Sequence, residues 1–126
     1  MTDIKFTKEH EWVRVEEDVV TLGITDHAAE ALGDLVYVEL PEVGDEFDKG
    51  DAAVVVESSK SASDVYIPVA GQVIEVNESL NDSPENVNNS TYGDGWLVKV
   101  KTDDLSPLDD LLSKADYKKY LEEEDR

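Results

Sequence analysis

Short runs rich in valine and other β-branched residues recur from Trp12 to Val100. Gly, Pro, Asp and Asn cluster between these runs, which is the pattern of strands joined by tight turns. The regular spacing predicts a mainly β fold, a small sandwich or barrel, and disfavours a parallel sheet with crossover helices. The predicted strands are Trp12–Val15, Val19–Ile24, Leu35–Leu40, Ala52–Glu57, Asp64–Pro68, Gly71–Val76 and Trp96–Val100.

Helix signals are few. Asp26–Leu32 is rich in alanine and is followed by Gly33, a residue suited to end a helix, so a short connector helix is expected there. Ser83 followed by a proline predicts a single helical turn. Towards the C-terminus, the capping pattern at Ser106 predicts a helix that breaks at a second capping residue, Ser113, and then resumes.

Length and charge restrict the function. A chain of 126 residues is long enough for one compact domain and too short for separate catalytic and binding domains, so one domain over residues 1–126 is expected. Its 31 acidic and 11 basic residues give a formal charge of −20. This charge disfavours nucleic acids and anionic membrane surfaces as partners, and indicates either docking to basic surfaces or a coat suited to a salt-rich cytoplasm.

The chain contains no cysteine, so any redox chemistry must come from a group added to it. Residues 1–10 show neither an apolar signal segment nor an arginine-rich presequence, and no apolar stretch is long enough to span a bilayer. A cytoplasmic location without a membrane partner is therefore expected.

The segment most informative about function is a lysine-centred turn between two predicted strands. Small or polar residues surround Lys60 within Ser58–Ser63, and β-prone runs flank them on both sides. This pattern predicts a hairpin with Lys60 at its tip, where small neighbours leave the amine accessible to a modifying enzyme. The pattern alone does not separate such a lysine from an ordinary solvated one.

The turn and many blocks around it resemble glycine cleavage H proteins. Glu57–Tyr66 is similar to the lipoyl-attachment hairpin of this family, although Ser59 and Ser61 stand where valine and alanine are common. The likeness covers nearly the whole chain, with blocks in the family's order. They are His10–Trp12, Gly23–Ala28, Leu32–Asp34 with Val36–Pro41, Val43–Gly44, Asn81–Glu85, Tyr92–Leu97 and Leu111–Leu121.

The resemblance implies a lipoyl/biotinyl-type barrel-sandwich hybrid of two antiparallel sheets with a short connector helix and a C-terminal helix. It implies that Lys60 carries lipoic acid through an amide bond, within an attachment hairpin that includes Glu57, Ser59 and Ser61. Two further carboxylates, Glu11 and Asp64, are similar to positions near the cleft that holds the loaded arm, where they would suit a protonated amine. The alternative for both is a solvated surface acid.

By the same resemblance, the chain would be a non-catalytic carrier with no catalytic residues of its own. It would take an aminomethyl group from the pyridoxal-phosphate-dependent glycine dehydrogenase (decarboxylating) and deliver it to a folate-dependent aminomethyltransferase. Dihydrolipoyl dehydrogenase would reoxidise the arm, which a lipoate ligase or a lipoyl/octanoyl transferase would install. No metal site is expected, because His10 and His27 are the only histidines and cysteine is absent.

A lipoate relay or regulatory protein of the same build is the main alternative, because it would use the same hairpin to pass lipoyl groups to other proteins. A biotinyl domain is disfavoured because methionine usually flanks its lysine, and a 2-oxoacid dehydrogenase lipoyl domain because it lacks the His10–Trp12 block and the C-terminal helix. A hydrolytic or metal-dependent enzyme is disfavoured because no set of nucleophile, base and orienting residue is apparent.

Overall fold

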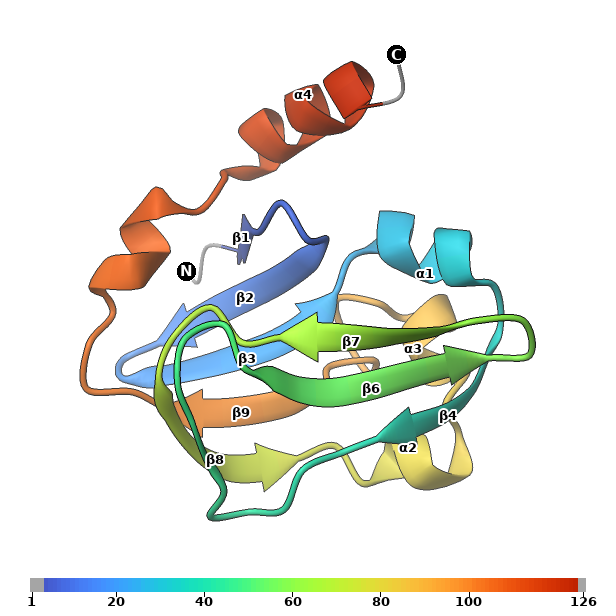
Figure 1. Ribbon diagram of the computed structural model, residues 1–126, viewed down its shortest axis with the longest axis horizontal. Coiled ribbons are helices and arrows are strands. Elements are labelled where there is room, and N and C mark those ends of the chain that lie inside the picture. The colour runs from blue at the N-terminus through green and yellow to red at the C-terminus, as the bar shows by residue number, and fades with distance from the viewer. Residues whose placement is uncertain (1–3, 125–126) are drawn as a thin grey trace.

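Two antiparallel sheets pack face to face in the computed structural model, which describes residues 4–124 (Figure 1). The larger sheet has the strand order β1-β2-β3-β9-β8-β5, and the smaller has the order β4-β6-β7. Within residues 4–124 the sheets do not close on each other as a barrel. The strands are β1 Ile4–Phe6, β2 Glu11–Glu16, β3 Val19–Ile24, β4 Leu35–Glu39, β5 Glu46–Phe47, β6 Ala52–Ser58, β7 Ala62–Tyr66, β8 Gly71–Val76 and β9 Val98–Lys101.

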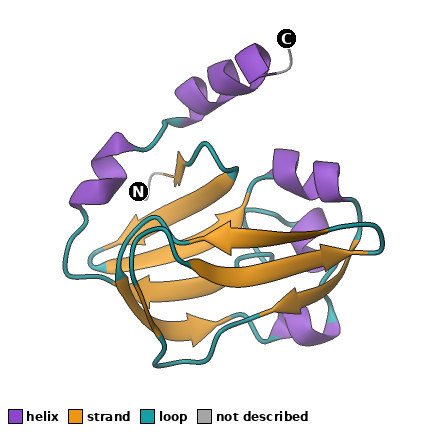
Figure 2. Ribbon diagram, in the orientation of Figure 1, coloured by secondary structure: helices purple, strands orange, loops and turns teal. Residues whose placement is uncertain are grey.

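The helices lie around the margins of the sheets (Figure 2). They are α1 Asp26–Leu32, α2 Ser79–Asp82, α3 Asn86–Asn89, the 3₁₀ helix η1 Ser106–Asp110 and α4 Lys114–Glu124. The expected mainly β fold of two antiparallel sheets, with a connector helix and a C-terminal helix, is thus confirmed.

Local sequence signals account for the helix ends. Thr25 caps α1 by accepting a hydrogen bond from the Ala28 backbone N–H, and Gly33 ends it with a positive φ of 86°. The predicted bounds of this helix are confirmed residue for residue. The predicted break at Ser113 is also confirmed, because its hydroxyl accepts a hydrogen bond from the Asp116 N–H at 3.2 Å as α4 begins.

The main core lies between the two sheets and consists mostly of valine and leucine. The larger sheet contributes Val13, Leu22, Val98 and Val100, and the smaller contributes Val38, Val54, Val56 and Val65, all nearly completely buried. Burial of one such side chain is worth about 1.5–3 kcal/mol relative to exposure. This core fixes the smaller sheet, and with it the β6–β7 hairpin, against the rest of the molecule.

A second cluster lies on the opposite face of the larger sheet and attaches α4. The rings of Phe6 and Tyr117 stack with their centroids 4.7 Å apart, and the fully buried Trp12 packs with them. The Trp12 indole N–H donates a hydrogen bond to the Thr91 carbonyl at 3.0 Å. Strand β2 is therefore buried on both faces near its start, where Glu11 lies.

Three short elements were not predicted: β1, β5 and α2. β1 pairs with β2 and bridges to Leu112, and β5 pairs with β8 over two residues, so partners distant in sequence stabilise them. Two predicted strands are displaced. The strand predicted at Asp64–Pro68 is observed as β7, because pairing resumes at Ala62 directly after the turn, and the strand predicted at Trp96–Val100 is observed as β9.

Candidate functional site

Lys60 occupies the turn of the β6–β7 hairpin, as predicted. β6 ends at Ser58, β7 begins at Ala62, and Glu57 pairs with Ala62 across the hairpin. The turn extends past the end of the smaller sheet beside α1 (Figure 1). Ser59, Lys60 and Ser61 are all exposed, so an approaching protein meets the lysine amine between two small side chains.

The Ser58 side chain clamps this turn. Its hydroxyl oxygen accepts hydrogen bonds from the backbone N–H groups of Lys60 at 3.4 Å and Ser61 at 3.2 Å, and the hydroxyl donates to the Ser61 carbonyl at 3.2 Å. The Ser58 N–H also donates to the Ser61 carbonyl at 2.8 Å. This role of Ser58 was not predicted, although a serine that bonds the backbone two or three residues ahead is a known turn signal.

The hairpin lies in a strongly acidic part of the chain. Between Val15 and Val98, Lys49 and Lys60 are the only basic residues, against nineteen acidic ones. Glu57 is half-buried and shares a cross-strand row with Tyr37 and Ala62. A basic surface on a partner would therefore be attracted to the region that presents Lys60.

Glu11 lies at a different kind of position, where the two sheets meet. It is only 3% exposed. One carboxylate oxygen accepts a hydrogen bond from the Tyr66 backbone N–H at 2.7 Å, and the other accepts one from the Thr7 hydroxyl at 3.0 Å. The Glu11 N–H in turn donates to the Thr7 hydroxyl oxygen at 3.1 Å. The alternative that Glu11 is a solvated surface acid is therefore wrong.

Burial changes the acid–base behaviour of Glu11. Removal from water disfavours the carboxylate, and this effect outweighs the hydrogen bonds from Tyr66 and Thr7, so the pKa of Glu11 rises from 4.5 to about 7. The group therefore titrates near neutral pH. Thr7 was not predicted to take part, and no local sequence pattern connects it to a buried carboxylate.

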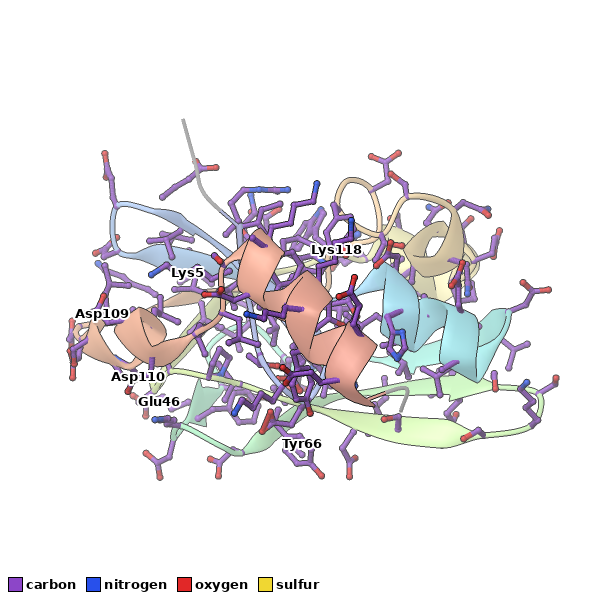
Figure 3. All side chains as sticks on the ribbon, turned by 90° about the horizontal axis from the view of Figure 1, so that it is seen from above. Lys5, Glu46, Tyr66, Asp109, Asp110 and Lys118 are labelled. Carbon is purple, nitrogen blue, oxygen red and sulfur yellow. The ribbon has the colours of Figure 1, made fainter. Side chains whose placement is uncertain are left out.

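A cleft of about 310 Å³ opens beside Glu11. Its lining includes Phe6, Thr7, Lys8, Glu9, Glu11, Lys49, Tyr66, Ile67, Asp110 and Leu112, of which Tyr66 and Asp110 are labelled in Figure 3. Asp64 does not line this cleft and is exposed on β7, two residues before Tyr66. The structure thus gives the two carboxylates different surroundings, and their shared role in holding an arm stays a prediction.

Two other observations concern metals and membranes. The rings of His10 and His27 lie 4.7 Å apart, and His10 Nδ1 is hydrogen-bonded to the Tyr117 hydroxyl at 2.8 Å. Residues 4–124 contain no group of three His, Cys, Asp or Glu side chains placed to hold a metal ion. No helix in the same range has the length and apolar character needed to cross a membrane.

Comparison with known proteins decides the family. A family model described as "Glycine cleavage H-protein" matches residues 4–124. The chain belongs to the glycine cleavage H-protein family. The matched range includes the Lys60 hairpin, Glu11 and the C-terminal helix. Membership supports the carrier of lipoyl groups in glycine cleavage over the lipoate relay, and the chain is therefore a carrier component of that system.

Individual H proteins agree over nearly the full length. The chain is 58% identical over 125 residues to the glycine cleavage system H protein of Saccharophagus degradans, covering 98% of this chain and 96% of that protein. It is 57% identical to the corresponding protein of Xanthomonas euvesicatoria, covering 98% and 95%. A crystal structure of the H protein from Mycobacterium marinum superposes with a TM-score of 0.85 at 36% identity, covering 98% of each chain.

Proposed function

We propose that this H-protein family member is a non-catalytic carrier whose lipoyl group is joined to Lys60 by an amide bond. The observation that supports this most is the exposure of Lys60 at the tip of a clamped hairpin, between the small residues Ser59 and Ser61. The carrier would receive an aminomethyl group from the decarboxylating glycine dehydrogenase and deliver it to the aminomethyltransferase. Dihydrolipoyl dehydrogenase would restore the arm, and a lipoate ligase or a lipoyl/octanoyl transferase would install it.

The residues at the tip fit such a group. A ligase must admit the amine into its own active site, which requires an uncrowded lysine on a turn of fixed shape. The Ser58 clamp fixes the backbone, while the four-carbon lysine stem supplies reach. When bound, the lipoyl group supplies a disulfide that can be opened to carry a one-carbon amine, chemistry that a cysteine-free chain cannot provide itself.

We also propose that the cleft beside Glu11 receives the amine end of the loaded arm. The lining combines apolar side chains such as Ile67 and Leu112 with the buried Glu11 carboxylate. Each Glu11 oxygen accepts one hydrogen bond from the protein and has capacity to accept another. Asp64 adds a second negative charge on the strand that borders the cleft through Tyr66. The ionised forms of these carboxylates would favour a protonated amine over a neutral one, while Lys8 and Lys49 in the lining act in the opposite direction.

We also propose the domain organisation, the location and the classes of partner. Residues 1–126 would act as one domain in the cytoplasm, and residues 1–3 and 125–126 of that range lie outside the described structure. The net charge of −20 supports partners that are neither nucleic acids nor anionic membranes.

The test of the attachment site is intact mass after incubation with lipoate, ATP and a lipoate ligase. Wild type should gain one lipoyl-sized increment, and Lys60→Arg, which keeps the charge, should gain none. Lys49→Arg is the matched control because Lys49 is the other basic residue in the acidic segment. An increment retained in Lys60→Arg would contradict the assignment.

Function is tested with the modified protein. Lipoylated wild type should support glycine decarboxylation by the decarboxylating glycine dehydrogenase, whereas Lys60→Arg should not. Transfer of lipoyl groups to other apo-proteins without any support of glycine decarboxylation would instead favour the relay function.

A further inference from the structure

The end of the Lys60 side chain lies near the corner between α1 and β4. A Cβ atom placed on Gly33 would lie 3.4 Å from Lys60 Cε and 3.8 Å from Lys60 Nζ, so the lysine end lies next to the space that a side chain at position 33 would occupy. Gly33 is the residue that ends α1, so the lysine stem runs back from the hairpin tip towards this helix end. The amine is exposed, but it lies beside a defined surface of the protein.

The shape of this corner depends on a glycine. Gly33 has φ 86° and ψ −167°, a combination that residues with a Cβ essentially never adopt. Its N–H donates to the Ala29 carbonyl at 3.1 Å and closes the last turn of α1. This hydrogen bond does not satisfy the other backbone groups of the corner. The Gly33 carbonyl and the N–H of Leu35, the first residue of β4, need hydrogen-bond partners from elsewhere.

Asn88 on α3 supplies those partners with one side-chain amide. Its Nδ2 donates to the Gly33 carbonyl at 2.9 Å and to the Ala29 carbonyl at 3.4 Å, and its Oδ1 accepts from the Leu35 N–H at 2.9 Å. The three backbone groups lie before, within and after the corner. Asn88 thus joins the end of α1 to the start of β4, although it lies 53 residues from Leu35 in the sequence.

We propose that Asn88 is a positioning residue for acylation of Lys60: it fixes the Gly33 corner, and the corner limits the positions of the lysine amine. The proposal rests on the proposed lipoylation of Lys60. In that step the deprotonated Nζ attacks the acyl carbon of lipoyl adenylate, which the ligase forms from lipoate and ATP with release of pyrophosphate. The N–C bond forms, the bond from the acyl carbon to the phosphate oxygen breaks, AMP leaves and the amine releases one proton to solvent.

A restricted lysine reaches the ligase with less conformational freedom left to lose. Binding an unrestricted lysine costs entropy, and a preorganised one reacts faster for the same contacts. Removal of the Asn88 amide should free the corner and lower kcat/KM for lipoylation while the rest of the hairpin, including the Ser58 clamp, keeps its hydrogen bonds.

The experiment compares initial lipoylation rates of Asn88→Ala and Asn88→Asp with wild type, using lipoate, ATP and a lipoate ligase. Asn88→Asp keeps the acceptor for Leu35 but loses both donors and places a carboxylate oxygen against two carbonyls. Both variants should lower kcat/KM about fivefold or more. Asn77→Ala is the matched control, because the Asn77 amide donates to the Asp94 and Trp96 carbonyls, both at 2.7 Å, and within the described residues it makes no hydrogen bond to Gly33.

A second readout follows Lys60 itself. In wild-type protein, ¹³C relaxation of Lys60 Cε should show more restricted motion than that of Lys49 Cε, and Asn88→Asp should remove the difference. Equal mobility of the two lysines in wild type would overturn the proposal even if the Asn88 variants failed to fold.

Rates provide the other decisive outcomes. The proposal would also be overturned if the Asn88 variants were lipoylated at the wild-type rate, or if their rates fell no further than the rate of Asn77→Ala. Absence of any Lys60 modification in wild type is a separate result, which would contradict the proposed function itself.

Discussion

The Lys60 turn and the Glu11 junction are the two candidate functional regions, and they are stabilised in opposite ways. Hydrogen bonds in the turn run between residues at most three apart, and its tip is exposed. Glu11 is buried and bonds to Tyr66, which is 55 residues away in the sequence. Both regions adjoin β7, since the turn precedes its first residue and Glu11 binds the backbone of its last.

The difference shows how a carrier can expose a reactive group while the strands that lead to it stay fixed. The lysine must enter the active sites of other proteins, so its turn cannot be buried in its own fold. The strand that leads away from the turn is instead fixed at its far end by a buried carboxylate that also joins the two sheets. We therefore expect changes at Glu11 to alter stability more than changes in the turn.

The largest expected effect is the dependence of stability on pH that Glu11 creates. Because folding raises the pKa of Glu11 from 4.5 to about 7, its stabilising contribution is fully present below about pH 4.5 and is lost as pH rises through about 7. Between about pH 5 and pH 8, wild type should lose about 2–3 kcal/mol of unfolding free energy relative to Glu11→Gln, which cannot titrate. Urea denaturation at a series of pH values measures this difference.

A control for net charge accompanies this measurement. Glu57→Gln removes the same charge from the half-buried position beside the Lys60 turn, so it measures the part of the change that comes from net charge. If Glu11→Gln and Glu57→Gln gave the same curve, Glu11 would not be the source of the effect, and the contrast between the two regions would fail.

A smaller effect is expected from the Ser58 clamp. Ser58→Ala removes the side-chain hydrogen bonds to Lys60 and Ser61 and should lower the unfolding free energy by about 1 kcal/mol. Amide exchange at Ser61 should accelerate in the same variant. Ser59→Ala is the matched control, since its exposed side chain makes no hydrogen bond within the described residues, and it should change stability by less than about 0.5 kcal/mol.

The smallest effect is expected at the hairpin between β2 and β3. A substitution there changes the backbone conformation of the turn, whereas Ser58→Ala changes side-chain hydrogen bonds. Glu17 lies in the two-residue turn between β2 and β3 and has a positive φ of 56°, a conformation that favours glycine. Glu17→Gly should raise the unfolding free energy by about 0.5 kcal/mol, a balance between relieved strain and added chain entropy.

Asp18→Gly is the control for that substitution, because Asp18 does not have a positive φ and glycine there relieves no strain. The change adds entropy to the unfolded chain and removes the exposed ion pair between Asp18 and Lys101, whose atoms lie 3.8 Å apart. It should lower stability. A gain at Asp18 as large as the gain at Glu17 would show that backbone strain is not the cause. Both values come from thermal unfolding at one pH.

Several elements were predictable because their signals are local. Capping by Thr25 and Gly33 sets the bounds of α1, and the small residues around Lys60 placed the hairpin turn correctly. The strand predicted at Asp64–Pro68 was two residues late, because the length of the turn is set by the Ser58 hydrogen bonds rather than by β propensity. β5 has no local signal and forms because two residues of β8 are available to pair.

By itself, the sequence determined the alternation of strands and turns, the connector helix, the exposed lysine and, through resemblance, the family. Hydrogen bonds between near neighbours and the periodicity of apolar residues produce these features, and both are visible in a linear chain. Only the tertiary structure decided that Glu11 is buried while Asp64 is exposed, and that Asn88 supports the corner beneath Lys60. Burial and backbone pairing over more than fifty residues depend on how the sheets pack, so no local pattern records them.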